Sequence, residues 1–176
     1  MKFAEKFNLP IITLLDTPGA YPGIGAEERG QGSAIAQNLI EMANLRVPII
    51  SIVIGEGASG GALGIGLADK IICLENTWYS VISPEGCASI LFRDPSMASS
   101  AADSMKVTAN DLLEIGIADE ILKEPDGAAH ISPDKMSDIL KETIIRTYTN
   151  LKKYDLEELI KLRNEKYDKI GYYEQR

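Results

Sequence analysis

The chain has 176 residues, of which 45% are hydrophobic, and this length and composition are typical of one globular domain with its own core. Its 26 acidic and 18 basic residues give a formal net charge of −8, which excludes nucleic acid as an expected partner. No apolar run reaches the roughly 18 residues that a membrane span requires, and the first residues do not resemble a signal peptide, so we expect a cytoplasmic protein. One histidine and two isolated cysteines predict no metal site.

The first half of the chain alternates between predicted strands and helices. Residues 1–7 form a helical apolar face, and residues 11–15 form a short apolar run typical of a buried strand. A loop rich in Gly and Pro follows over residues 16–25, after which Glu27 and Glu28 are expected to open a helix. The pattern then predicts a strand over residues 49–54, a glycine loop, a short helix over residues 62–68, and strands over residues 71–74 and 79–83.

The second half is predicted to be mainly helical. Pro84 and Glu85 suit the first turn of a helix, and Thr108 suits the N-cap of another that ends at Gly116. We also expect a helix over residues 97–106, a strand over residues 117–122, a helix from Ser132 to about Leu151, and a last helix capped by Asp155. Strands, glycine loops and helices in this order predict an α/β layered domain.

The glycine loop after residue 54 fits a dinucleotide-binding motif. Gly55, Gly57 and Gly60 form G-x-G-x-x-G after a predicted strand, and Glu75 follows 20 residues after Gly55. In such motifs the glycines admit a pyrophosphate and the acid binds a ribose. A dinucleotide-binding oxidoreductase domain is therefore one reading of the loop.

The same loop fits two other kinds of site. Its G-x-S-x-G match around Ser59 precedes Asp119 and His130 in the chain order of an α/β-hydrolase triad, although Ser59 also suits a helix cap. Alternatively, adjacent glycines at a helix N-terminus present free N–H groups that stabilise an enolate oxygen. The glycines could also serve only for close packing of helix and strand.

A second loop favours the enolate reading. Residues 16–19 match the D-x-x-G segment of GTPases, but the chain contains no G-x-x-x-x-G-K-[ST] motif. Both glycine loops follow predicted parallel strands, so they are expected at the same edge of the sheet, where ligands bind in open α/β folds.

Three long motifs resemble a known family. The runs DTPGAYPGIGAEERGQ, VPIISIVIGEGASGGALGIG and YSVISPEGCASILF are similar to those of the alpha subunits of bacterial and plastid acetyl-CoA carboxylase carboxyltransferases. The resemblance continues to the C-terminal RNEKYDKIG and matches the C-terminal part of the family subunit. It implies a crotonase-like superhelix of strand–strand–helix turns, truncated at its N-terminus. We expect a carboxyltransferase core over residues 1–125 and a helical extension over residues 126–176.

The resemblance also implies an activity and partners. The family transfers a carboxyl group from carboxybiotin to acetyl-CoA, giving malonyl-CoA in the first committed step of fatty acid synthesis. Biotin is supplied by the biotin carboxyl carrier protein, after its carboxylation by biotin carboxylase. A zinc-containing beta subunit completes the site in an α2β2 assembly, and the alpha subunit itself holds no metal.

Carried over by position, the resemblance assigns a role to individual residues. Backbone N–H groups of Gly60 and Gly61, with a contribution from Ala62, are expected to form the oxyanion hole. The residues expected at the substrate and carboxybiotin site are Gly19, Ala20, Tyr21, Arg29, Glu85 and Gly86. Arg29 can pair bidentately with a carboxylate, although it could also simply belong to a helix start. The sequence departs from the family pattern at Ala58 and Ala128, where glycine is commoner and a positive φ would strain alanine.

Overall fold

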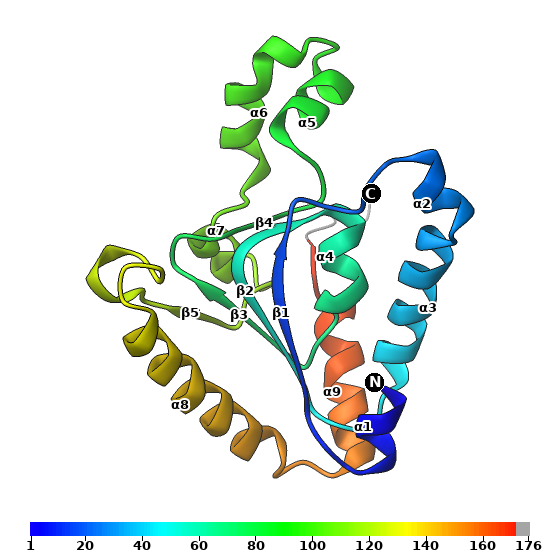
Figure 1. Cartoon of the computed structure of the whole chain (residues 1–176), viewed down its shortest axis with the longest axis vertical. Helices are drawn as coiled ribbons and strands as arrows, with labels where there is room; N and C mark the ends of the chain where they lie inside the picture. The colour runs from blue at the N-terminus through cyan, green and yellow to red at the C-terminus, as the bar shows by residue number, and fades with distance from the viewer. Residues whose placement is uncertain (172–176) are drawn as a thin grey trace, which may run out of the picture.

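The computed structural model describes residues 1–171 and contains one parallel β-sheet flanked by helices (Figure 1). Its strands are β1 (Ile11–Thr17), β2 (Ile49–Ala58), β3 (Lys70–Leu74), β4 (Trp78–Ser80) and β5 (Glu120–Leu122). The order across the sheet is β1-β2-β3-β5, and β4 pairs with the last residues of β2. All of these pairings are parallel, as the alternation of strands and helices predicts.

The helices of the described residues range from 5 to 19 residues in length. Their bounds are α1 (Lys2–Lys6), α2 (Ile24–Glu28), α3 (Gln31–Asn44), α4 (Ser59–Gly66), α5 (Pro84–Leu91), α6 (Ala98–Met105), α7 (Ala109–Glu114), α8 (Pro133–Leu151) and α9 (Leu156–Asp168), with short 3-10 turns at Pro95–Met97 and Pro125–Gly127. Three predicted helix starts are confirmed. The side chains of Ser83, Thr108 and Asp155 each accept a hydrogen bond from the backbone three residues further on.

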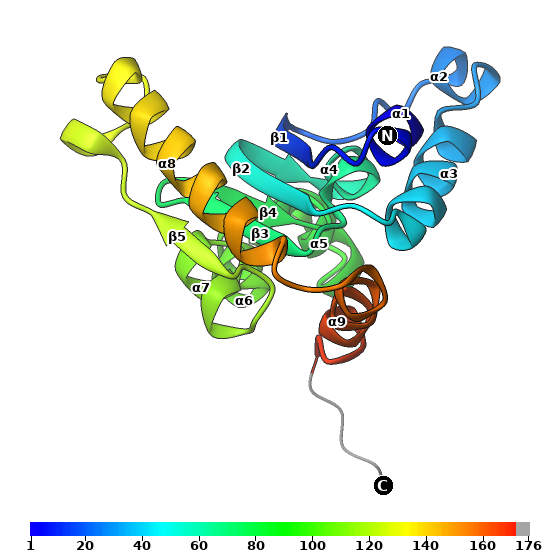
Figure 2. The ribbon, with the colours of Figure 1, turned by 90° about the horizontal axis from the view of Figure 1, so that it is seen from below.

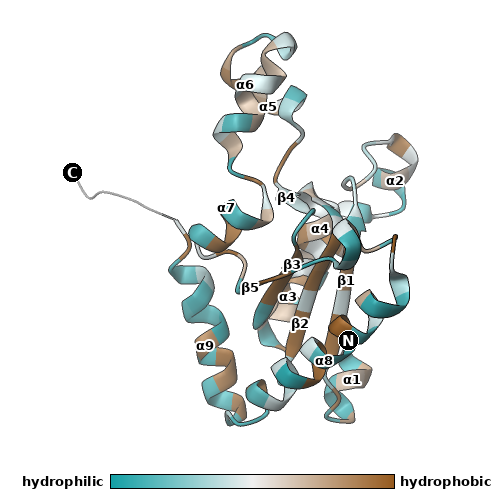
Figure 3. Ribbon diagram, turned by 90° about the vertical axis from the view of Figure 1, so that its left-hand side faces the viewer, coloured by the Kyte–Doolittle hydropathy of each residue, from teal (hydrophilic) through white to brown (hydrophobic). Residues whose placement is uncertain are grey.

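Alternate residues of the central strands face two different layers of helices. Ile50, Ile52, Ile72 and Leu74 pack against α8, which covers one face of the sheet (Figure 2). Their neighbours in the chain point to the opposite face, where α3, α4 and α7 supply the packing partners. Figure 3 shows β1 and β2 as largely hydrophobic ribbons, whereas helices such as α8 and α9 alternate between hydrophilic and hydrophobic residues. Burial on both faces explains why these strands are continuous runs of Ile, Val and Leu.

A buried arginine joins the last helix to the base of the sheet. Arg163 of α9 is 1% exposed, and it donates to both carboxylate oxygens of Asp69 and to the carbonyl oxygens of Met42, Leu45 and Val47. Since every one of these acceptors belongs to the chain ahead of β2 or β3, the arginine fixes α9 beneath the sheet.

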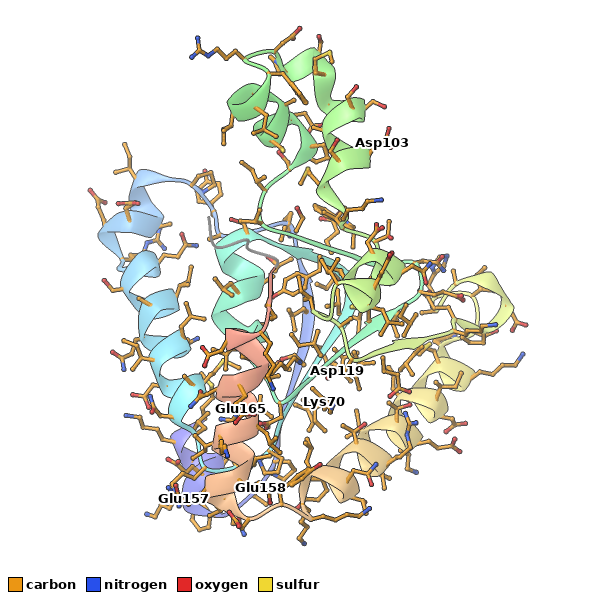
Figure 4. All side chains as sticks on the ribbon, turned by 180° about the vertical axis from the view of Figure 1, so that it is seen from behind. Lys70, Asp103, Asp119, Glu157, Glu158 and Glu165 are labelled. Atoms are coloured by element: carbon orange, nitrogen blue, oxygen red, sulfur yellow. The ribbon has the colours of Figure 1, made fainter. Side chains whose placement is uncertain are left out.

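A second charged group lies beside the first. Asp119, immediately before β5, accepts hydrogen bonds from Lys70 at 2.8 Å and from Lys166 at 2.5 Å; Figure 4 labels Asp119 and Lys70, which lie close together. Burial opposes ionisation of Asp119, but the ammonium group of Lys166, with Lys70 and the Ile71 N–H, outweighs it and holds the pKa of this carboxyl below its usual range.

Several sequence-based boundaries are wrong. Glu27 and Glu28 do not open the long helix, because they are the last two residues of the short α2. Gly30, with φ +78°, then separates α2 from α3. Strand β2 continues four residues beyond the predicted end, because its final residues pair with β4 on one side and with Thr17 on the other. Ser132 precedes α8 as expected, but its hydroxyl donates to Asp126 and makes no side-chain cap.

The expected extension over residues 126–176 includes α8 and α9, and its residues 172–176 lie outside the described part of the chain. Within residues 1–171, none of the helices combines the length and the apolar character needed to cross a membrane.

Candidate active site

The candidate site centres on the turn that joins β2 to α4. Ala58 ends the strand with φ −122° and ψ 140°, and Ser59 turns the chain with φ +53°. Ser59 is the first residue of α4, and the first N–H groups of a helix lack acceptors within it. In the part of the chain that the structure describes, the N–H groups of Gly60 and Gly61 belong to the first turn of α4 and donate no hydrogen bond to the backbone of a loop. They are therefore available to an anion, and the helix dipole adds a positive potential.

Gly61 lies directly against the backbone of the first loop. A Cβ atom on Gly61 would be 2.7 Å from the carbonyl carbon of Gly19 and 2.9 Å from the backbone nitrogen of Ala20. Only glycine allows this approach. The structure thus brings the two glycine loops together at the carboxyl ends of β1 and β2, as the sequence predicts.

Gly60 has a different environment. A Cβ atom there would make ordinary contacts, 3.5 Å from Cδ1 of Ile35 and 3.9 Å from Cβ of Ala20. Ala62, the third residue expected to contribute, is fully buried in the cluster beneath α4. The two glycines of this turn therefore differ. Gly61 must lack a side chain so that the two loops can touch, whereas Gly60 could carry a Cβ atom without a clash.

Asp16 fixes the first loop to β2. Its Oδ1 atom accepts a hydrogen bond from the Glu56 N–H at 3.1 Å, and the carboxyl group occupies the space that a Cβ atom on Gly55 would fill. Further along, Gly19 adopts φ +133°, a conformation that favours glycine, and its N–H donates to Oγ1 of Thr17. The loop after β1 is therefore held in place by a hydrogen bond to β2 and by one between Gly19 and Thr17.

Tyr21 and Arg29 lie near each other beside this loop. Both line a shallow depression together with Gly25, Ala26 and Gln31. Tyr21 is 74% exposed, and Nε of Arg29 donates to the carbonyl oxygen of Gly25 at 2.8 Å, which leaves the terminal nitrogens of the guanidinium open to a ligand. The pair supplies an aromatic face and a cation within one depression.

Glu85 and Gly86 belong to the first turn of α5. The Gly86 N–H donates to Oγ of Ser83, and the helix forms with α6 a hairpin that projects from the sheet (Figure 1). Because β4 pairs with the end of β2, the base of this hairpin follows the same sheet edge as the glycine turn. The nearest neighbours differ: a Cβ atom on Gly86 would meet Ile82 and Ser83, whereas Cβ atoms on Gly60 and Gly61 would meet Ala20 of the first loop.

An apolar groove borders the glycine turn on its other side. It has a volume of about 350 Å³ and includes Ser59, Gly60, Leu63, Tyr79 and Val81 among its lining residues. Sequence reasoning did not find Tyr79 as part of this region. It assigned the residue only to a strand, and no local pattern marks a tyrosine that reaches a helix formed by earlier residues.

The geometry does not support a hydrolase triad. Ser59 is exposed in the turn, but Asp119 is occupied by Lys70 and Lys166, and His130 is exposed in the loop before α8. The expected capping role of Ser59 is also wrong, because its side chain makes no cap hydrogen bond to α4.

The dinucleotide motif is also not realised. Gly55 and Gly57 lie within β2 and not in the turn, so their positions do not form a phosphate-binding loop. Glu75 accepts a hydrogen bond from the Glu124 N–H at 2.7 Å, a contact that connects the ends of β3 and β5. Among residues 1–171, no group of three or more His, Cys, Asp or Glu side chains is placed to hold a metal ion.

The two departures from the family pattern are accommodated without strain. Ala58 has φ −122° and Ala128 has φ −160°, so both lie in the extended region that any residue adopts. Neither position requires glycine in this chain.

Comparisons with known proteins place the chain in a family. Residues 1–171 match the family described as acetyl co-enzyme A carboxylase carboxyltransferase-like. The chain is 52% identical over 173 residues to the acetyl-coenzyme A carboxylase carboxyl transferase subunit alpha of Flavobacterium psychrophilum, covering 98% of this chain and 55% of that protein. It is 54% identical over 174 residues to the same subunit of Clostridium botulinum, covering 99% and 64%. The chain thus spans between about half and two thirds of the length of these relatives.

Solved structures give the same assignment of fold. A transcarboxylase 12S structure superposes with a TM-score of 0.61 at 25% identity, covering 69% of this chain and 26% of that one. The Pseudomonas malonate decarboxylase MdcD-MdcE hetero-dimer superposes with a TM-score of 0.62 at 18% identity, covering 78% and 57%. These likenesses confirm the expected crotonase-like α/β fold. With two glycine loops joined at one sheet edge and a family match over almost its whole length, the chain belongs to the acetyl-coenzyme A carboxylase carboxyltransferase-like family.

Proposed function

We propose that this chain provides the catalytic region of a carboxyltransferase alpha subunit of acetyl-CoA carboxylase. In this reaction the carboxyl group of carboxybiotin moves to acetyl-CoA and gives malonyl-CoA. The observation that supports it is the position of the Gly60 and Gly61 N–H groups, in the first turn of a helix that rests on the backbone of Gly19 and Ala20. Family membership supplies the reaction class.

The chemistry requires stabilisation of negative charge on oxygen. Breaking the bond between the ureido nitrogen and the carboxyl carbon releases an electron pair to the ureido group. Removing a proton from the thioester α-carbon moves charge to the carbonyl oxygen. Two fixed N–H donors and a helix dipole stabilise such an oxyanion as it develops. The carbanion then forms the new carbon–carbon bond to the carboxyl group, and the α-proton is taken up by the ureido nitrogen, so no side-chain base is required.

The side chains around the turn suit orientation of the substrates. Tyr21 offers an aromatic face for a ring, and Arg29 offers a guanidinium that pairs with a carboxylate. Gly19 and Ala20 support the helix that carries the N–H donors. Glu85 and Gly86 border the pocket once the hairpin of α5 and α6 meets a partner.

The activity depends on partners. A zinc-containing beta subunit completes the site in an α2β2 assembly and binds most of the coenzyme A. Biotin arrives on the biotin carboxyl carrier protein after carboxylation by biotin carboxylase, and all of these components work in the cytoplasm. The name of the Flavobacterium relative, a subunit alpha, supports a protein that acts within a multisubunit enzyme.

Co-expression tests this proposal. The chain is produced with the beta subunit encoded in the same genome, and malonyl-CoA decarboxylation is measured with free biotin as the acceptor. We expect biotin-dependent release of acetyl-CoA from the complex and none from either subunit alone. A stable complex without this activity would contradict the proposal. Titration with NAD and NADP, followed by protein fluorescence, is expected to show no binding.

A further inference from the structure

Tyr79 reaches from the end of β2 to the last residue of α4. In the sheet it lies beside Gly57, the second-last residue of β2. A Cβ atom on Gly57 would be 2.7 Å from Cδ2 of the tyrosine ring, and a Cβ atom on Gly66, the last residue of α4, would be 2.7 Å from its hydroxyl oxygen. Two glycines therefore provide the space that this one side chain occupies.

The tyrosine is fixed from behind by the chain that follows the hairpin of α5 and α6. Its backbone N–H donates to the carbonyl oxygen of Val107 at 2.9 Å, and the preceding residue, Trp78, forms an antiparallel bridge with Thr108. Thr108 in turn caps α7 through a reciprocal pair of hydrogen bonds with Asp111. The ring is thus attached to a rigid part of the fold, and it contacts α4 from there.

The ring also belongs to the apolar layer beneath α4. It packs against the cluster that contains Leu15, Val53 and Ala62, so it supports the face of the helix opposite to solvent. Burial raises the pKa of the Tyr79 hydroxyl above its ordinary value, so this group remains protonated at neutral pH. The hydroxyl makes no hydrogen bond to another side chain or to the backbone within residues 1–171.

Small rotations of α4 have large effects at its N-terminus. A helix of eight residues is about 12 Å long. A tilt of about 5° around its far end moves the first turn by about 1 Å, a displacement that can lower a reaction rate about 100-fold. Tyr79 contacts Gly57, two residues before the helix, and Gly66, the last residue within it, so it is placed to limit this tilt.

We propose that Tyr79 is a positioning residue for carboxyl transfer: its ring, lying between Gly57 and Gly66, sets the direction in which α4 presents the N–H groups of Gly60 and Gly61. This inference rests on the function proposed above. It assigns the effect to the ring and not to the hydroxyl, because the ring makes the contact with Gly57 and its Cζ atom also lies 3.7 Å from the position of a Cβ atom on Gly66.

Three variants separate positioning from ordinary packing. Tyr79→Phe keeps the ring, and Tyr79→Leu removes it. Tyr148→Leu is the matched control, because Tyr148 is a half-buried tyrosine that packs against the cluster on the opposite face of the sheet. Residual dipolar couplings of the backbone N–H groups are measured for each variant of the 176-residue chain. We expect the couplings of Gly60 and Gly61 to change in Tyr79→Leu and to stay unchanged in Tyr79→Phe and Tyr148→Leu.

The same variants are then assayed in the complex with the beta subunit. We expect Tyr79→Leu to lower kcat about 10- to 100-fold with KM within about twofold of the original, and Tyr79→Phe to stay within about threefold. Unchanged couplings at Gly60 and Gly61 in folded Tyr79→Leu would overturn the inference. Changed couplings with full kcat would instead uphold the positioning of α4 by Tyr79 and refute the proposed role of the two N–H groups.

Discussion

Replacing Gly61 by alanine tests the contact on which the candidate site depends. The added Cβ atom would lie 2.7 Å from the carbonyl carbon of Gly19, whereas ordinary contacts begin at 3.4 Å, so helix and loop must separate by about 0.7 Å. Such overpacking costs roughly 1–3 kcal/mol, which a domain with about 5–15 kcal/mol of stability tolerates. A shift of this size at the oxyanion donors, however, is expected to lower kcat about 10- to 100-fold.

Gly60→Ala is the matched control. Its Cβ atom would meet Ile35 at 3.5 Å, an ordinary contact, and the substitution retains the backbone N–H. We therefore expect kcat within about threefold of the original. Both variants are assayed for malonyl-CoA decarboxylation in complex with the beta subunit, and urea unfolding reports their stability. If Gly61→Ala assembles and retains kcat within about twofold, the proposed oxyanion geometry is wrong. Equal losses in the two variants would refute the steric argument.

Three further outcomes follow from individual side chains. Arg163→Met leaves the Asp69 carboxylate buried without its partner, so we expect urea unfolding to show a loss of about 3–5 kcal/mol. Asp119→Asn is expected to destabilise the chain most at neutral pH. The folded-state pKa of Asp119 lies below its ordinary 3.8, so its contribution to the free energy of unfolding is present above pH 3.8 and disappears as the pH falls through the folded-state pKa. Urea unfolding curves of the original chain and the variant at pH 7, 4 and 3 measure this contribution. The same difference in stability at all three pH values would contradict the assignment. Ser59→Ala is expected to leave carboxyl transfer within about threefold, since no base among residues 1–171 is hydrogen-bonded to its hydroxyl, and a complete loss would indicate a nucleophilic role.

Much of the fold could be predicted because its signals are local. Continuous apolar runs mark strands that are buried on both faces, and the caps at Ser83, Thr108 and Asp155 lie within three residues of the N–H groups they satisfy. The errors occurred where a distant segment decides the outcome. Strand β2 includes Gly55 and Gly57 only because β1 and β4 pair with its end, and neither pairing is visible in the local pattern.

The candidate site divides in the same way. The sequence by itself determined the two glycine loops, their place after parallel strands, and the family, since these are properties of contiguous motifs. Only the tertiary structure decided the role of each glycine. Gly61 allows contact with the backbone of Gly19, 42 positions earlier in the chain, and Gly57 and Gly66 leave space for Tyr79. Gly60 could carry a Cβ atom without a clash. The physical reason is that the role of a glycine depends on which group packs against it. That group is determined by the packing of helix on sheet and not by the residues adjacent in the chain.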